Sequence, residues 1–265
     1  MNFKEKYGKW ALITGGTSGI GEEMAKIVAS KGVNLVLVAR RQNVLDEKAK
    51  LFKKQFGIDV KTISADLTKK EDLGKIFEET TALEIGLLIP NAAIENHGFL
   101  MDIPIDKELA AIQMDIVSVF TMTHHFGNKM VERGKGGILL VSSMIGHMPN
   151  PYFANYAGVK AYVANFGFSL NYELKNKGVD VTVLSPGPTD TPMLNGAMGE
   201  MDISKMPMSI QKPDYVAQLA IDGLGNRPHV IPGRKNTIMV RMTKMMSTLK
   251  QINAGGKMMD KAMND

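Results

Sequence analysis

The chain has 265 residues, of which 44% are apolar and 22% are charged, and this is the composition of an ordinary globular protein. Its net charge of +5 comes from cations spread along the chain, so a nucleic-acid-binding patch is disfavoured. Without cysteine, disulfides, thiolate metal sites and a cysteine nucleophile are excluded. The sequence has no 18-residue apolar run and no apolar segment near its start. We therefore expect a cytoplasmic protein without a signal peptide or a membrane span.

Short apolar runs alternate with segments of helical periodicity along the whole chain. The expected strands cover residues 10–14, 33–39, 60–65, 85–90, 136–143, 179–186 and 229–233. The expected helices cover residues 20–30, 43–56, 69–82, 105–132, 152–176 and 213–225. Strands that alternate with helices form right-handed crossovers and a parallel sheet. The predicted fold is therefore α/β: a single Rossmann-type domain over residues 1–265, with a doubly wound parallel sheet of about seven strands and helices on both faces.

A glycine-rich turn, TGGTSGIG at residues 14–21, joins the first expected strand to the first expected helix. Gly15 and Gly19 would let the backbone approach a pyrophosphate, and Gly21 would let the helix pack closely on the strand. The amino terminus of that helix supplies N–H groups and a partial positive charge for phosphates. The turn therefore predicts dinucleotide binding, with Thr17, Ser18 and Ile20 as further contacts. The alternative is a plain glycine turn before a helix.

The end of the second expected strand bears on the choice of dinucleotide. NAD-binding folds commonly place an acidic residue there for the ribose 2′-hydroxyl, but this chain has Ala39 followed by Arg40 and Arg41. A guanidinium can bind a 2′-phosphate through two hydrogen bonds, so these residues favour NADP(H). The alternative is that both arginines simply face water.

The motif YAGVK places Tyr156 and Lys160 four residues apart on an expected helix, and therefore on one face of it. A free tyrosine has a pKa near 10, too high for a base at neutral pH. An adjacent ammonium would lower that pKa and make the tyrosine useful for proton transfer. Tyr152 and Tyr162 have no lysine at this spacing. An ordinary aromatic residue on a helix is the alternative interpretation.

Together, the T-G-x-x-x-G-x-G spacing, the Y-x-x-x-K motif and the SPGPTDT segment resemble the short-chain dehydrogenase/reductase family from about Lys9 to Gly233. The resemblance implies that Ser143, thirteen residues before Tyr156, is the catalytic serine. It also implies a homodimer or homotetramer joined through two long helices. Further cofactor contacts implied by the resemblance are Asp66, Leu67, Asn91, Ala92, Tyr156, Lys160, Pro186, Gly187, Thr189 and Thr191.

The chain departs from the family pattern at a position that bears on catalysis. Asp115 stands where many members have an asparagine that helps to hold a water relay to the lysine. An ionised aspartate accepts hydrogen bonds but cannot donate them, and it would hold Lys160 charged more firmly. Asp115 is therefore a candidate catalytic residue. Either the water relay tolerates an aspartate at this position, or the aspartate lowers the activity. Pro90 and Ala93 also depart from the family's N-N-A-G segment.

The carboxyl-terminal part is rich in methionine, with 12 of the 20 methionines at or after Met193. The resemblance implies a substrate loop at about 190–211, and flexible methionines there suit apolar ligands or simply fill gaps. An amphipathic helix is expected at about 236–252, with an apolar stripe that includes Ile238, Met242 and Leu249. We expect this stripe to pack on its own or a sister chain, although a cleft cover or membrane contact is also open. Residues 253–265 are expected to be loosely ordered.

The combined prediction is an NADP(H)-dependent oxidoreductase that interconverts a secondary alcohol and a ketone on a bulky apolar substrate, with Tyr156 as general acid and base. The opening MNFKEKYGKW and the length resemble bacterial bile-acid hydroxysteroid dehydrogenases, which suggests a steroid substrate. A 3-oxoacyl or broad carbonyl reductase is the alternative, and a non-catalytic NADP sensor is a remote one. No metal site is predicted, because His97, His124 and His125 form no ligand pattern with carboxylates.

Overall fold

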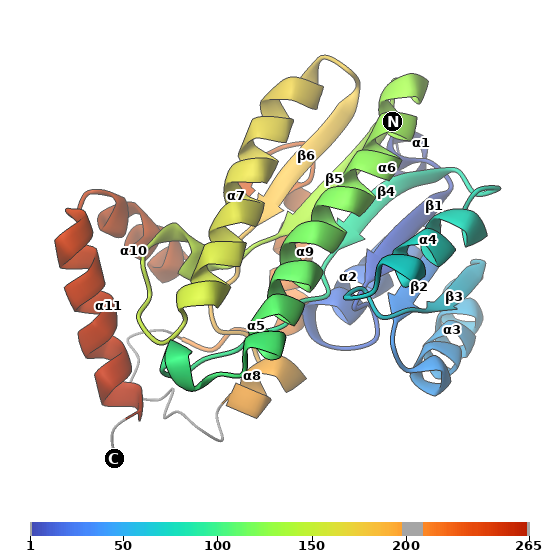
Figure 1. Ribbon diagram of the computed structural model, residues 1–265. Coiled ribbons are helices and arrows are strands. Elements are labelled where there is room, and N and C mark those ends of the chain that lie inside the picture. The colour runs from blue at the N-terminus through green and yellow to red at the C-terminus, as the bar shows by residue number, and fades with distance from the viewer. Residues whose placement is uncertain (1, 198–208, 264–265) are drawn as a thin grey trace.

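Figure 1 shows the computed structural model of the chain, which describes residues 2–197 and 209–263. Seven parallel strands form one sheet in the order β3-β2-β1-β4-β5-β6-β7. The strands are β1 (Trp10–Thr14), β2 (Asn34–Ala39), β3 (Val60–Ser64), β4 (Ile85–Pro90), β5 (Gly136–Val141), β6 (Val179–Leu184) and β7 (His229–Val230). The strand order reverses between β1 and β4, and ligands of doubly wound sheets bind at such a switch point. The predicted Rossmann-type α/β fold is confirmed.

Helices cover both faces of the sheet and bury two apolar cores. One core lies under α2, α3 and α9, and the other under α4, α6 and α7. The helices are α1 (Phe3–Tyr7), α2 (Gly19–Ser30), α3 (Gln42–Phe56), α4 (Lys70–Glu79), α5 (Ile105–Ile112), α6 (Val119–Arg133), α7 (Ala154–Lys175), α8 (Pro192–Ala197), α9 (Pro213–Gly223), α10 (Arg234–Lys244) and α11 (Thr248–Met263). Within the described ranges, none of these helices has the length and apolarity needed to cross a membrane.

The long helix predicted at 105–132 is one continuous rod with an altered middle (Figure 1). Between α5 and α6, Gln113–Ser118 is π-helical, which adds a residue to the turn. The Ser118 hydroxyl donates a hydrogen bond to the Met114 carbonyl at 2.6 Å, as a serine does when it satisfies a loosened turn. The wide turn contains Asp115 and sets the direction of its side chain.

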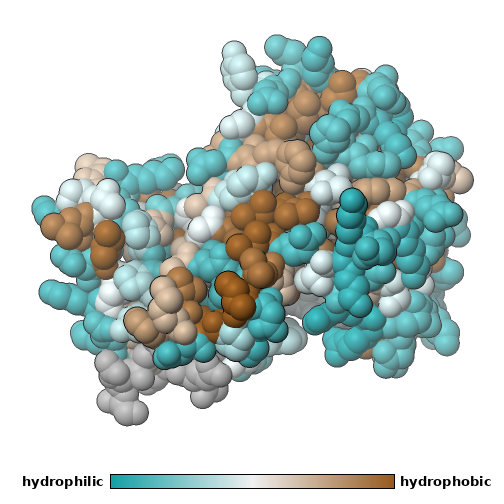
Figure 2. Space-filling view, viewed as in Figure 1, coloured by the Kyte–Doolittle hydropathy of each residue, from teal (hydrophilic) through white to brown (hydrophobic). Residues whose placement is uncertain are grey.

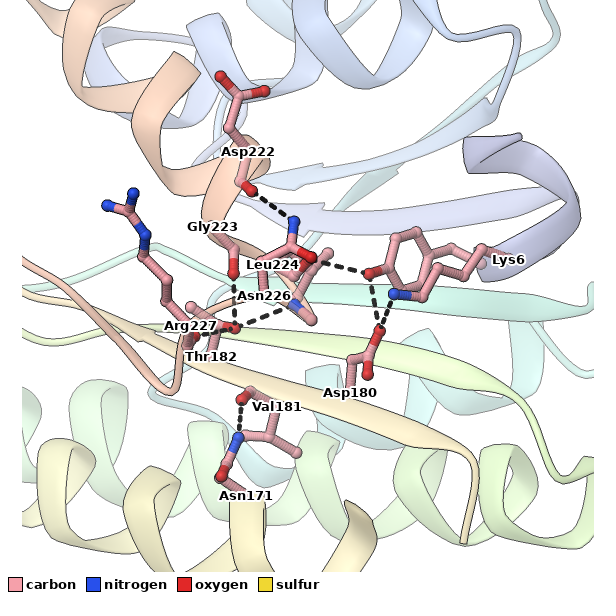
Figure 3. A network of polar contacts seen from close by, with 12 residues as sticks. Lys6, Asn171, Asp180, Val181, Thr182, Asp222, Gly223, Leu224, Asn226 and Arg227 are labelled. Atoms are coloured by element: carbon pink, nitrogen blue, oxygen red, sulfur yellow. Dashed lines mark hydrogen bonds and ion pairs between the residues drawn. The ribbon is translucent and has the colours of Figure 1, made fainter. Parts of the chain in front are cut away.

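A polar network fixes the amino-terminal edge of the sheet (Figure 3). The Tyr7 hydroxyl donates to Asp180 Oδ2 at 2.8 Å and to the Leu224 carbonyl at 3.2 Å, and Lys6 pairs with the same carboxylate oxygen at 2.6 Å. Beside them, the Thr182 hydroxyl donates to the Arg227 carbonyl at 2.8 Å. The network ties α1 and the end of α9 to β6, on the side of the sheet away from its carboxyl ends.

The carboxyl-terminal predictions need three corrections. The expected helix at 236–252 is two helices, because the chain turns after Lys244 before α11 begins. Residues 253–263 were expected to be loosely ordered, but they are helical because Met259 and Ala262 are buried. Most of the apolar stripe does not pack on the described part of its own chain: Ile238, Met242, Met245, Leu249 and Ile252 are exposed, and Met246 is half-buried.

Candidate functional site

A cavity of about 1280 Å³ opens at the carboxyl ends of the strands, where the loops after β1, β2, β4, β5 and β6 meet. All but three of the residues predicted for catalysis or cofactor binding line it; the exceptions are Gly21, Asp66 and Asp115. Residues of α10 and α11 close the opposite wall. The cavity therefore joins the residues predicted for a dinucleotide to an apolar wall from α10 and α11. Half of the predicted substrate loop, about 190–211, lies outside the described residues, and α8 lies in its first part.

The glycine turn has the backbone shape that a close ligand requires. Gly15 and Gly19 have φ values of +65° and +55°, a region that side-chain-bearing residues rarely adopt. A Cβ on Gly19 would lie 2.9 Å from the Thr191 methyl group, and one on Gly21 would collide with the Gly15 carbonyl oxygen. The turn leads directly into the 12-residue α2, whose amino terminus faces the cavity through Gly19 and Ile20. These residues fit a dinucleotide phosphate.

The two arginines after β2 also lie on the cavity wall. Arg40 and Arg41 are exposed, and Arg41 is the residue that precedes the first turn of α3. The Ser64 hydroxyl donates to the Arg40 carbonyl at 2.9 Å, which fixes the backbone but leaves the guanidinium free to reach a ligand. Two adjacent guanidinium groups at this edge fit a 2′-phosphate.

Asp66 is not on the cavity wall, although its neighbours Ala65 and Leu67 line the cavity. Its carboxylate accepts hydrogen bonds from the Thr68 hydroxyl at 2.8 Å and the Thr68 N–H at 3.1 Å. Burial alone would raise the pKa of Asp66, but these bonds and the charges of Arg40 and Lys69 lower it. The side chain closes a local turn, and Leu67 presents the surface to the cavity.

The segment after β4 binds the backbone of β1. Asn91 Nδ2 donates to the carbonyls of Thr14 and Gly15 at 3.2 and 3.3 Å, and the Thr14 hydroxyl accepts from the N–H of Asn91 and of Ala92, both at 3.0 Å. Despite Pro90 and Ala93, the segment therefore holds the glycine turn in place. On the opposite side, Thr189 and Thr191 use their hydroxyls locally, on the carbonyls of Gly187 and Thr189.

Ser143, Tyr156 and Lys160 come together at the centre of the cavity, where β5 ends and α7 begins. Ser143 follows β5 and accepts a hydrogen bond from the Ile145 N–H at 3.3 Å, which orients its hydroxyl. The Tyr156 phenol is within hydrogen-bonding reach of that hydroxyl. Lys160 Nζ lies 5.7 Å from the centre of the Tyr156 ring.

The pKa of Tyr156 is raised well above 10, against the sequence-based expectation that Lys160 lowers it. Burial is the largest cause, and the nearby charges of Glu95 and Asp115 add to it, while the hydrogen bond with Ser143 acts in the opposite direction. Lys160 does not bring the pKa below 10, because burial and the two carboxylates outweigh it and its ammonium is already paired with Asp115. Its ammonium contacts Asp115 Oδ1 at 2.7 Å and donates to the Val141 carbonyl at 3.2 Å.

Asp115 supports Lys160 in a way that needs only acceptor atoms. One carboxylate oxygen pairs with the ammonium, and the other accepts from the Ile94 N–H at 3.0 Å. Asp115 is 1% exposed and Lys160 is 3% exposed, so this is a buried ion pair. The inability of aspartate to donate a hydrogen bond is therefore no handicap for these contacts.

Sequence reasoning missed Glu95, which lies on the cavity wall two residues beyond the segment that matches the family. Burial raises its pKa to about 7, although Lys160 lowers it in part. His97 Nδ1 lies 3.8 Å from Glu95 Oε1. The sequence did contain a signal for Glu95. It is an acidic residue that directly follows β4 and the PNAAI segment, and such a position faces the active site in this fold.

The chain matches the family model described as short chain dehydrogenase over residues 9–201, and it belongs to that family. The family comprises oxidoreductases that use a nicotinamide cofactor, so the predicted enzyme class is confirmed. Within the family, a 7beta-hydroxysteroid dehydrogenase of Mediterraneibacter gnavus is 30% identical over 94% of this chain and 95% of its own length. A very-long-chain 3-oxoacyl-CoA reductase of Anas platyrhynchos is 34% identical over 93% and 82%.

Solved structures agree with this assignment. A structure described in work on 7beta-hydroxysteroid dehydrogenase stereoselectivity superposes with a TM-score of 0.87 at 28% identity, and covers 97% of this chain and 100% of its own. A short-chain dehydrogenase from Sphingobium yanoikuyae in complex with NADPH gives a TM-score of 0.78 at 28% identity, over 89% and 94%.

Proposed function

We propose that the protein is an NADP(H)-dependent oxidoreductase that interconverts a secondary alcohol and a ketone on a bulky apolar substrate, with hydroxysteroids as the first candidates. The observation that supports this most directly is the single cavity that joins the glycine turn, the Ser143–Tyr156 pair and a methionine-rich wall. The hydroxysteroid dehydrogenase relatives support the substrate class.

In this proposal, a bound reduced nicotinamide supplies the hydride to the carbonyl carbon. The Ser143 hydroxyl donates a hydrogen bond to the carbonyl oxygen and holds it beside the Tyr156 phenol. Tyr156 gives its proton to that oxygen as the charge develops there, which yields the alcohol and leaves a phenolate. The Lys160 ammonium, held by Asp115, stabilises the phenolate until solvent returns a proton. Oxidation uses the same groups in reverse.

The raised pKa of Tyr156 makes the two directions respond differently to pH. At neutral pH the phenol keeps its proton, which is the form that reduction requires. Oxidation requires the phenolate, which forms only at alkaline pH. We therefore expect ketone reduction to proceed near neutrality and alcohol oxidation to gain rate as the pH rises.

A substrate panel tests the proposed function. NADPH absorbance would be followed with keto steroids, keto bile acids, 3-oxoacyl thioesters and small ketones. Turnover of the steroids is the expected result, whereas turnover of thioesters alone would favour the reductase alternative that the Anas platyrhynchos relative supports. Binding of NADPH without turnover of any of them would favour a sensor, although the intact Tyr156–Lys160 pair argues against it.

The preference for NADP(H) is tested by a double substitution, Arg40→Asp with Arg41→Ala. The new carboxylate repels a 2′-phosphate and accepts from a ribose hydroxyl, so kcat/KM for NADPH should fall at least ~10-fold relative to NADH. Arg241→Ala is the control, because Arg241 is an exposed residue of α10 away from the cavity. A double variant that keeps its preference for NADPH would overturn the assignment.

We also propose that two copies associate through α5, α6 and α7. Ile105, Leu109, Val117 and Phe120 are exposed along the rod that runs from α5 to α6. Figure 2 shows a brown, apolar band over this part of the surface. Burial of such side chains favours association. Analytical ultracentrifugation should show a dimer or tetramer. The substitution Phe120→Lys should shift the association equilibrium toward the monomer.

A further inference from the structure

Helix α11 forms the end of the cavity opposite the cofactor side and is fixed there by contacts with the active-site loop. Its Met259 packs with Phe153, just before α7, and the Tyr152 hydroxyl donates to Asp260 Oδ1 at 3.0 Å. A Cβ on Gly255 would lie 3.2 Å from the Pro149 carbonyl oxygen, so the helix approaches that loop closely. The inner face of α11 therefore packs against the loop that leads to Tyr156.

Two lysines of α11 lie on the cavity wall. Lys257 and Lys261 are four residues apart, which puts them on one face of the helix, and both line the cavity while remaining open to solvent. Within residues 2–197 and 209–263, no carboxylate lies in ion-pairing distance of either ammonium. The adjacent acid, Asp260, is hydrogen-bonded to Tyr152 instead.

The sequence around these lysines is cationic as a whole. From Arg234 to Met259 there are six lysines and arginines and no acidic residue. Of the described cations of α10 and α11, however, only Lys257 and Lys261 line the cavity. Lys250 is an exposed lysine of the same helix and lies away from it. Lys257 and Lys261 therefore differ from the other cations of α10 and α11 by their position on the cavity wall.

The cavity between the lysines and the catalytic groups is mainly apolar. Met148, Phe153, Met239, Val240 and Met258 line it. At the catalytic end the wall carries an acidic residue, Glu95, and at the α11 end it carries two ammonium groups. An elongated substrate with a negative charge is therefore attracted in the orientation that places this charge at α11.

We propose that Lys257 and Lys261 bind the anionic head group of the substrate, whose apolar body fills the methionine-lined part of the cavity. This inference rests on the proposed function and adds an orientation: the anionic end lies at α11 and the reacting carbonyl at Tyr156. The shared chemistry is a carboxylate or a phosphate, such as the acid group of a bile acid or the phosphates of an acyl-CoA.

The test compares charged and neutral forms of the same ligand. Binding of a 7-keto bile acid and of its methyl ester to the NADP⁺-loaded protein is measured by titration calorimetry. The same is done for a 3-oxoacyl-CoA and the corresponding 3-oxoacyl N-acetylcysteamine thioester. The proteins are the wild type, the double variant Lys257→Gln with Lys261→Gln, and the matched control Lys250→Gln.

The expected result is that the wild type binds the charged form more tightly than the neutral form. The double variant should lose about three- to ten-fold in affinity for the charged form, since each exposed ion pair contributes modestly, while its affinity for the neutral form changes less than about twofold. The loss should shrink as salt is added. A loss with the bile acid identifies a carboxylate site, and a loss with the acyl-CoA identifies a phosphate site.

Three outcomes would overturn the inference: equal losses for charged and neutral forms, the same loss in Lys250→Gln, or no preference for the charged form in the wild type. The proposed function fails separately. If the wild type reduces neither the neutral ester nor the neutral thioester with NADPH, the proposed function is wrong. If it reduces them but the double variant keeps the preference for charged ligands, only the inference about the lysines is wrong.

Discussion

Two groups of the same three residue types, tyrosine, lysine and aspartate, lie at opposite edges of one sheet. At the amino-terminal edge, Tyr7 donates to Asp180, which also pairs with Lys6. At the carboxyl-terminal edge, Lys160 pairs with Asp115 beside Tyr156. In each group the lysine nitrogen lies 5.2 or 5.7 Å from the centre of the tyrosine ring.

The two groups differ in what the tyrosine hydroxyl faces. The Tyr7 hydroxyl is buried and has two protein acceptors, so it stabilises the fold. Tyr156 lies on the wall of a large cavity and has Ser143 as its neighbour. In both cases burial raises the pKa of the tyrosine above 10. A perturbed tyrosine therefore indicates catalysis only when its hydroxyl is open to a ligand.

The largest expected effect comes from Tyr156→Phe. The proposed proton donor is lost while the ring and the cofactor site remain, so kcat should fall at least ~10²-fold with NADPH binding unchanged. Steady-state kinetics and fluorescence titration of NADPH measure the two quantities. A fall in kcat of less than about threefold would show that Tyr156 is not the proton donor. The two tyrosines would then not differ in function as proposed.

Matched substitutions of the two aspartates come next. Asp115→Asn leaves a buried ammonium without its charge partner, and should lower the free energy of unfolding by about 3 kcal/mol, the low end for such a loss because the amide oxygen still accepts. Asp180→Asn affects a partly exposed pair and should cost about 1 kcal/mol. Urea unfolding of both variants tests the order, and equal losses would contradict it.

The same two aspartate variants should differ in their pH profiles. The negative charge of Asp115 raises the pKa of Tyr156, so Asp115→Asn should lower that pKa. Because the phenolate then forms more readily, the rise of alcohol oxidation with pH should begin at a lower pH than in the wild type. Asp180→Asn should leave the profile unchanged, and a shift in both variants would indicate a general structural effect.

Glu95→Gln tests the buried acid at the catalytic end. Its pKa is raised from 4.5 to about 7, so the stability linked to its protonated form is complete below pH 4.5 and is lost as the pH rises through 7. Above pH 7 the ionised group lowers the free energy of unfolding by up to about 3 kcal/mol. The variant should therefore gain stability relative to the wild type between pH 4.5 and 8. The exposed Glu132→Gln serves as the control, and a constant difference across this pH range would contradict the expectation.

The smallest effect is expected from Tyr7→Phe. Loss of the hydrogen bonds to Asp180 and Leu224 should lower the free energy of unfolding by about 1 kcal/mol without a change in kcat. Because the pKa of Tyr7 is raised, the wild type should lose stability as the pH rises above 10, when the tyrosine of the unfolded chain ionises. The unfolding curves of the two proteins should therefore converge at high pH. A fall in kcat would mean that the amino-terminal edge contributes to catalysis.

The sequence alone determined the fold and most of the candidate site. Period-two and period-3.6 patterns and the glycine turn are local properties, so the strand–helix alternation could be predicted from them. The spacing of the YAGVK motif selected Tyr156 and Lys160, and the resemblance to the family then selected Ser143. The same spacing could not predict the raised pKa of Tyr156, because burial and the charges of Glu95 and Asp115 depend on segments far apart in the chain.

Only the tertiary structure decided the role of residues 234–263, which form α10 and α11. The amphipathic stripe of residues 238–252 suggested one helix with a packed apolar face, but the chain turns after α10 and leaves that face exposed. The segment expected to be loosely ordered is helix α11, because Met259 finds a buried place beside Phe153. Periodicity shows that a helix has an apolar face, but only the packed fold shows which face meets the cavity and that Lys257 and Lys261 lie on it.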